Sequence, residues 1–225
     1  MSGHVHVHGA PPATPTPDAG SSSGRLLFTL AFFGSLAGGI LAYTYQKTLD
    51  PIRKFAGEKV EAAVREVLGA PARLDTLFLV GDKLSRTPPS GVDALAATKV
   101  FIGFDDKGAR IGVAVEEKSP GFADDVVLMV GFNPTTSALT GFKVLAQKET
   151  PGLGDKAEKD TSFAKRFVGK LVNPLKADKN PTTDPSTVQT ITGATITSKA
   201  VIKVINKAVA TWKPRFEAYE KEGAK

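Results

Sequence analysis

The segment Thr190-Ile191-Thr192-Gly193-Ala194-Thr195-Ile196-Thr197-Ser198 lies close to the C-terminus and leads directly into an apolar pattern. Apolar residues then recur at helical spacing and predict a helix with one apolar stripe: Val201, Ile205, Ala208 and Trp212. Ser198 or Thr197 is expected to cap this helix. The free N–H groups of its first turn suit a phosphate, which the hydroxyl of Thr195 can contact or carry. The alternative is a simple turn before a capped helix.

The composition of the chain narrows the classes of function. With 225 residues, we expect one folded domain plus appendages. The chain has no cysteine, which excludes disulfides, thiol chemistry and cysteine-ligated metal or iron–sulfur sites. The net charge of +6 suits an anionic membrane surface or an acidic cofactor or partner. Nucleic acid is not expected, because the lysines are scattered and no aromatic-rich basic motif accompanies them.

Residues 1–24 are predicted to form a disordered tail rich in histidine and proline. The chain's three histidines, His4, His6 and His8, all lie in it. They could hold a metal loosely, but nothing fixes their geometry, and a solvated tail is the preferred interpretation. Because the folded part has no imidazole, we predict no metal site and no hydrolytic site there.

Residues 25–46 are predicted to form a transmembrane helix. Leu26–Tyr45 is an uncharged apolar run of about 20 residues, the length that crosses a bilayer core. A cleaved signal peptide is the alternative. We favour a retained anchor, because the run is long for a signal peptide and no clear cleavage site follows.

The charges that flank this segment do not give a simple orientation. Arg25 precedes it, while Lys47, Arg53 and Lys54 follow it. A positive-inside count would therefore place the C-terminal domain in the cytoplasm, although large domains can translocate despite flanking charge.

Residues 47–213 are expected to form one α+β domain, followed by a charged, fraying tail over residues 214–225. An amphipathic helix is predicted over residues 52–68, ending at Gly69. Antiparallel strands should follow, with a hairpin turn near Gly108 and a Ser119–Ala123 loop that is a candidate wall of a site. The predicted strands cover residues 76–80, 99–104, 110–115, 126–132 and 139–146.

Two motifs together resemble a known family. Thr192-Gly193-Ala194-Thr195 resembles the S/T-G-A-T flavinylation motif of the G subunit of the Rnf electron transport complex and of the C subunit of Na⁺-translocating NADH:quinone reductase. About 40 residues earlier, Glu149-Thr150-Pro151-Gly152-Leu153-Gly154 matches the second signature of the same family. Taken alone, this second segment would be a structural loop. Gln189 stands where many members of the family carry an aspartate.

The resemblance implies a covalent flavin site. Thr195 would be joined to FMN through a phosphoester bond made by a dedicated flavin transferase. Gly152 and Gly154 permit close approach to a planar ring, Leu153 can cover a ring face, and Glu149 can hydrogen-bond to a ring edge. The full set of expected cofactor-binding residues is Thr195, Thr192, Gly193, Ala194, Ser198, Glu149, Thr150, Gly152, Leu153 and Gly154.

The resemblance also implies a function. The chain would be an FMN-carrying electron-transfer protein in the cytoplasmic membrane, with its flavin domain on the extracytoplasmic side. Its partners would be the other membrane subunits of a complex that couples electron flow between ferredoxin and NAD to ion movement. We expect no independent catalytic activity. We also expect no nicotinamide site, because no G-x-G-x-x-G unit with the required strand and helix is present. Two alternatives stay open: a C-type or free-standing flavin carrier, and a flavin-free assembly module.

Overall fold

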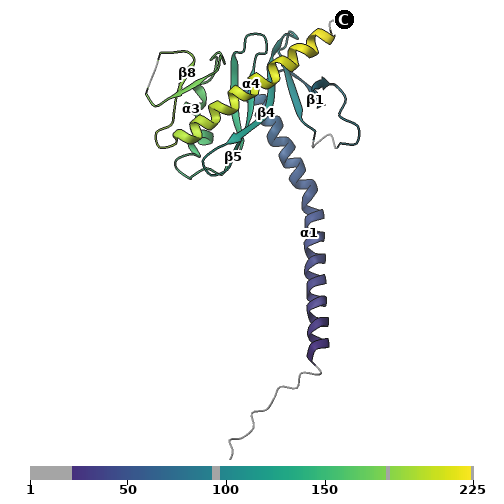
Figure 1. Cartoon of the computed structure of the whole chain (residues 1–225). Coiled ribbons are helices and arrows are strands. Elements are labelled where there is room, and N and C mark those ends of the chain that lie inside the picture. Colours follow the sequence, from purple (N-terminus) through teal and green to yellow (C-terminus); the bar gives the residue numbers. More distant parts are fainter. Residues whose placement is uncertain (1–21, 93–96, 181–182, 224–225) are drawn as a thin grey trace, which may run out of the picture. The chain divides into compact units, whose positions relative to one another are not determined.

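A computed structural model of the chain describes residues 22–92, 97–180 and 183–223 (Figure 1). The predicted tail, residues 1–24, lies outside this description as far as residue 21. The elements, in chain order, are α1 (Ser22–Val67), β1 (Arg73–Val80), β2 (Lys83–Ser85), β3 (Lys99–Phe104), β4 (Arg110–Pro120), β5 (Asp125–Phe132), β6 (Leu139–Ala146), α2 (Lys156–Lys159), α3 (Thr161–Lys165), β7 (Lys176–Asp178), β8 (Thr187–Gln189) and α4 (Thr195–Gly223).

The chain divides into two compact units, residues 1–53 and 54–225, and the division falls inside α1. Within the first unit, α1 is apolar enough and long enough to cross a membrane, and it is the one such helix among the described residues. The helix does not end at residue 46, the predicted end of the anchor, but continues with Pro51 in its interior. How much of it the bilayer covers stays a prediction.

The second unit is built on a six-stranded sheet with the order β2-β1-β3-β4-β5-β6, in which all neighbours are antiparallel. The predicted bounds of β3 and β6 are confirmed, while β4 extends beyond its prediction to Pro120. The hairpin between β3 and β4 turns at Gly108, which has φ 78° and donates its N–H to the Asp105 carbonyl at 3.0 Å. The predicted α+β class with an antiparallel sheet is confirmed.

Helices cover both faces of this sheet. On one face α4 runs across β4 and β5 (Figure 1), and Val113, Val115 and Val130 pack beneath it in the larger core. On the other face, the last turns of α1 pack on Ala114 and Met129. Because neighbouring residues of the central strands are buried on opposite faces, the strands are apolar throughout. This explains why their period-2 alternation is imperfect.

Glycines let the end of α1 lie close to the sheet. Gly103 pairs across the strands with Gly112, and Gly131 pairs with Gly141. A Cβ atom added at Gly131 would come within 2.7 Å of the Val67 carbonyl oxygen and within 2.5 Å of the Thr140 hydroxyl. The sheet can therefore accept the C-terminal turn of α1 only where side chains are missing.

Helix α4 differs from its prediction at both ends. It begins at Thr195 rather than after a cap at Thr197 or Ser198, because both of those side chains point inward and are buried. At the other end it continues to Gly223, with Phe216 only 2% exposed. The segment from residue 214 is therefore a packed helix end rather than the fraying tail that its charges suggested.

The glycine contact at α1 gives a stability prediction. Replacing Gly131 by alanine should lower the free energy of unfolding by about 1–3 kcal/mol, because the new methyl group would clash with the backbone carbonyl of Val67. Gly57→Ala, at a helical position with open space around its Cβ, should instead raise it by up to about 1 kcal/mol. Urea unfolding of the detergent-solubilised chain measures both. Equal effects of the two substitutions would contradict this packing.

Candidate functional site

The glycine motif forms a tight turn that leads into α4. Gly193 has φ 81°, a left-handed backbone conformation that favours glycine. The buried Ser198 hydroxyl accepts the N–H of Ile191 at 2.9 Å and donates to the Ala194 carbonyl at 2.9 Å. Ser198 therefore ties the turn to the helix. It leaves Thr195 as the first helical residue, with a half-buried side chain.

The Glu149–Gly154 loop packs against this turn. Gly154 lies so close to α4 that a Cβ atom there would come within 2.8 Å of the Thr197 hydroxyl. Leu153 extends over the motif, with its Cδ2 3.0 Å from the position of a Cβ at Gly193. The two segments that the sequence paired are thus in contact, although about 40 residues separate them.

Glu149 joins three separate segments. One carboxylate oxygen accepts the N–H groups of Phe122 and Ala123 at 2.9 and 3.1 Å. The other accepts the hydroxyl of Thr197 in the first turn of α4. The sequence suggested Glu149 as a partner for a ring edge, yet both of its oxygens are engaged by the protein and the residue is only 5% exposed. Its contacts are those of a residue that positions the site.

The hydrogen bonds to Glu149 also set its charge. Burial acts to raise the pKa of this carboxyl, but the hydrogen bonds from Thr197, Ala123 and Phe122 outweigh it, so the pKa lies below the usual 4.5. At neutral pH the residue is therefore a carboxylate, and this charged form is the better acceptor for the three donors.

A cavity of about 230 Å³ opens beside Thr195. It is lined by the ammonium-bearing side chains of Lys179 and Lys199, together with Asp178 and the buried Thr190. The short parallel pairing of β7 with β8 brings Asp178 and Lys179 to this place. Neither this pairing nor the position of Lys179 beside Thr195 was predicted from the sequence.

Large apolar side chains are exposed around the same turn. Ile196 is 54% exposed and Leu153 43%, and Phe122 beside Glu149 is 66% exposed. The exposed apolar side chains and the cavity with two lysines together fit a flavin nucleotide, whose ring is planar and apolar and whose phosphate is anionic. When bound, FMN would supply the electron-carrying chemistry, while these residues would hold it.

The structure brings the predicted site residues together in the Thr192–Thr195 turn, the Glu149–Gly154 loop and the first turn of α4. Thr192 and Gly193 are exposed on the turn, Ala194 is buried beneath it, and Thr150 accepts the N–H groups of Leu153 and Gly154 within its own loop. The Ser119–Ala123 loop is the predicted wall and contributes the two N–H groups to Glu149. Thr197 was expected only as a helix cap, because its position in the sequence does not reveal a distant partner such as Glu149. Arg166 donates to the Gln189 carbonyl at 2.9 Å and so supports the segment before the motif.

Comparison with known proteins shows which proteins this domain resembles. Residues 121–210 match the model of the FMN-binding domain family, and this range contains both motifs. The fold is that of the crystal structure of Shewanella oneidensis NqrC, with a TM-score of 0.59 and 18% identity over 72% of this chain and 97% of that one. The C subunit of Na⁺-translocating NADH-quinone reductase from Parabacteroides distasonis gives a TM-score of 0.50 at 21% identity, over 62% of this chain and 76% of that one.

Curated relatives make the resemblance more specific. The chain is similar to the G subunit of the ion-translocating oxidoreductase complex of Methanosarcina acetivorans, with 28% identity over 82% of this chain and 92% of the relative. The corresponding protein of Shewanella baltica is 29% identical over 81% of this chain and 85% of its own length. The resemblance to the G subunit predicted from the two motifs is confirmed.

The depressed pKa of Glu149 gives a prediction with a definite sign. A carboxyl whose folded pKa is lowered adds stability above its unfolded pKa and loses that contribution as pH falls through the folded pKa. Glu149→Gln should therefore be less stable than the wild type by about 1 kcal/mol at neutral pH. The difference should shrink as pH falls below 4.5.

Urea unfolding at a series of pH values measures this effect, with Glu58→Gln as a control for an exposed carboxylate on α1. A stability difference between Glu149→Gln and the wild type that stays constant from neutral to acid pH would contradict the role assigned to the charge.

Proposed function

We propose that this protein is a membrane-anchored electron-transfer subunit that carries FMN covalently on Thr195, within an Rnf-type complex that couples electron transfer between ferredoxin and NAD to ion translocation. The observation that carries the proposal is the contact between the two motifs. The Thr192–Thr195 turn, the Glu149–Gly154 loop and a lysine-lined cavity meet at the first residue of α4. The FMN-binding domain match covers all three.

The position of Thr195 supports its role as the carrier of the phosphoester. Its hydroxyl lies at the N-terminus of a 29-residue helix, where the free N–H groups and the helix dipole favour a phosphate. The hydroxyl oxygen would bond to phosphorus as a phosphoanhydride bond breaks in a flavin dinucleotide donor held by the flavin transferase. The nucleoside monophosphate would leave, and the hydroxyl proton would be lost to the medium.

The neighbouring residues would divide the remaining tasks. Lys179 and Lys199 line the cavity beside Thr195 and would neutralise the phosphate. Leu153 and Ile196 would cover ring surface, and Gly193 would allow the cofactor to lie close to the backbone. The single covalent link at the phosphate would leave the ring edge free to exchange electrons with a neighbouring protein of the complex.

The relatives support the membrane anchor and the complex. The apolar part of α1 and the similarity to the G subunit of ion-translocating complexes support a single-pass membrane protein. The flavin domain would lie on the extracytoplasmic side, as the resemblance implies, against the charge count of Lys47, Arg53 and Lys54. Covalent attachment would keep FMN bound in a shallow site on that side, where free flavin is scarce.

The fold favours a second candidate within the same class. Both solved structures described above are C subunits of the quinone reductase, so a C-type or free-standing flavin carrier fits the fold equally well. We prefer the assignment as a G subunit, because the sequence relatives with high coverage in both chains carry that name.

The attachment site is tested by intact-mass spectrometry of the full chain made together with a flavin transferase. The wild type and Thr192→Ala should gain the mass of one FMN less one water, and Thr195→Ala should gain nothing. A gain that survives in Thr195→Ala would overturn the assignment of the carrier. A colourless wild type with an active transferase would favour the flavin-free assembly module.

The phosphate role of Lys199 is tested by the rate of modification. Lys199→Gln removes a positive charge next to the cavity, and we expect about fivefold slower gain of mass, since a partly solvated ion pair is worth about 1 kcal/mol. Lys203→Gln, one turn further along α4 and exposed, is the matched control and should stay within about twofold of the wild type. Equal slowing in both variants would indicate a general effect of charge.

A further inference from the structure

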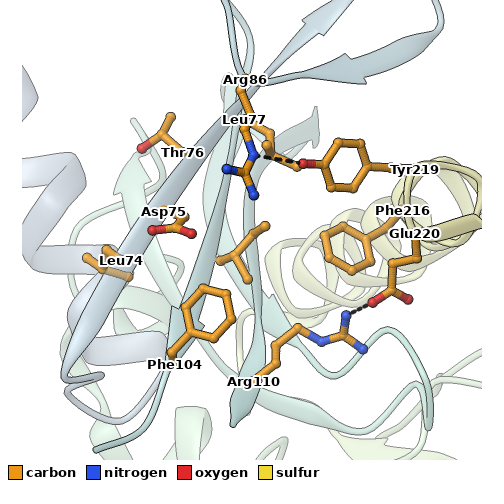
Figure 2. A pocket seen from close by; sticks show the side chains of 11 residues that line it. Leu74, Asp75, Thr76, Leu77, Arg86, Phe104, Arg110, Phe216, Tyr219 and Glu220 are labelled. Atoms are coloured by element: carbon orange, nitrogen blue, oxygen red, sulfur yellow. Dashed lines mark hydrogen bonds and ion pairs between the residues drawn. The ribbon is translucent and has the colours of Figure 1, made fainter. Parts of the chain in front are cut away.

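A second and larger cavity lies at the opposite end of α4. It has a volume of about 470 Å³ and is formed between β1 and β3 of the sheet and the last turns of the helix (Figure 2). Its helix residues begin at Phe216, about 30 Å along α4 from Thr195. The cavity is therefore separate from the proposed FMN site, and nothing in that function uses it.

The floor of this cavity is apolar. Leu77, Ile102 and Phe216 are buried in the main core, and Phe104 flanks them. A cavity of this volume with an apolar floor falls in the range typical of small-molecule sites. Figure 2 shows the aromatic rings of Phe104 and Phe216 on either side of it.

Two side-chain bridges connect the sheet side of the cavity to the helix. Arg86 donates to the Tyr219 hydroxyl at 3.3 Å, and Arg110 forms an ion pair with Glu220 (Figure 2). Because these bridges lie at two sides of the opening, they enclose a mouth rather than an open-ended groove. A compact ligand fits such a mouth better than an extended strand or a helix of another protein.

The charges around the mouth leave one cation available. The carboxylate of Glu220 is neutralised by Arg110, and that of Asp75 lies 3.5 Å from Arg73. Arg86 forms no ion pair within the part of the chain that the structure describes, although the charge of Asp75 acts on it from beyond ion-pair distance. Figure 2 shows its two terminal nitrogens turned away from Tyr219. A planar guanidinium with a free edge is suited to bind a carboxylate through two parallel hydrogen bonds.

We propose that this cavity binds a small, planar and mainly apolar organic carboxylate, with its ring on Phe104 and Phe216 and its carboxylate on Arg86. The site would give the protein a ligand-binding function separate from electron transfer. Removal of the Arg86 guanidinium costs the ligand the partner of its carboxylate, which corresponds to at least about a 10-fold loss of affinity.

Isothermal titration of the flavin-loaded full chain in detergent with 2-naphthoate tests the proposal. We expect saturable binding of one 2-naphthoate per chain, at least about 10-fold weaker binding in Arg86→Gln, and an intermediate affinity in Arg86→Lys. Arg65→Gln, an exposed arginine on α1 outside the cavity, is the matched control and should bind as the wild type does. Because all variants share the same micelles, partition of the probe into detergent cancels between them.

The neutral analogue 2-naphthamide separates charge recognition from apolar burial, and it should bind at least about 10-fold more weakly than 2-naphthoate. Equal affinity of the wild type and Arg86→Gln for 2-naphthoate would overturn the proposal, and so would equal affinity for the two probes. Absence of 2-naphthoate binding, together with loss of co-purifying membrane subunits in Arg86→Gln, would overturn it in favour of a protein-docking site.

Discussion

The carboxylate of Glu149 is the contact on which the candidate site depends. It accepts two backbone N–H groups from the loop between β4 and β5 and the hydroxyl of Thr197 from the first turn of α4. Loss of this carboxylate would leave the buried Thr197 hydroxyl without its acceptor and would release the two N–H groups of the loop. The lowered pKa of Glu149 reflects the same three donors. The buried carboxylate of Glu149 therefore holds the β4–β5 loop, the Glu149–Gly154 loop and the first turn of α4 in one arrangement.

The sheet explains why these segments meet at one end of the domain. Pro120 at the end of β4 pairs with Asp125 at the start of β5, and Ala146 at the end of β6 pairs with Val127. The β4–β5 connection and the segment that follows β6 therefore lie at the same end of the strands. Helix α4 crosses the face above them and begins there, at Thr195. The same helix ends over β1 and β3, and its length separates the proposed FMN site from the cavity at Arg86.

The sequence predicted the features that local patterns determine. The bounds of β3 and β6 follow from apolar runs between turn residues, and the two segments that the resemblance paired are in contact. Features that depend on distant partners were not predictable. Thr197 and Ser198 resemble helix caps in the sequence. In the structure the Thr197 hydroxyl donates to the Glu149 carboxylate, and the Ser198 hydroxyl accepts the N–H of Ile191. Lys179 lies at the site because β7 pairs with β8. The charged end of α4 packs on the domain because the Phe216 side chain is buried in the core.

A crystal structure of the flavin-loaded domain tests the central claim most directly. The account predicts continuous electron density from the Thr195 Oγ1 atom to the phosphate of FMN. The phosphate should lie in the cavity of Lys179 and Lys199, the ring against Leu153, and Glu149 should still be bonded to Phe122, Ala123 and Thr197. Density that leaves another hydroxyl, or a ring hydrogen-bonded directly to the Glu149 carboxylate, would contradict it.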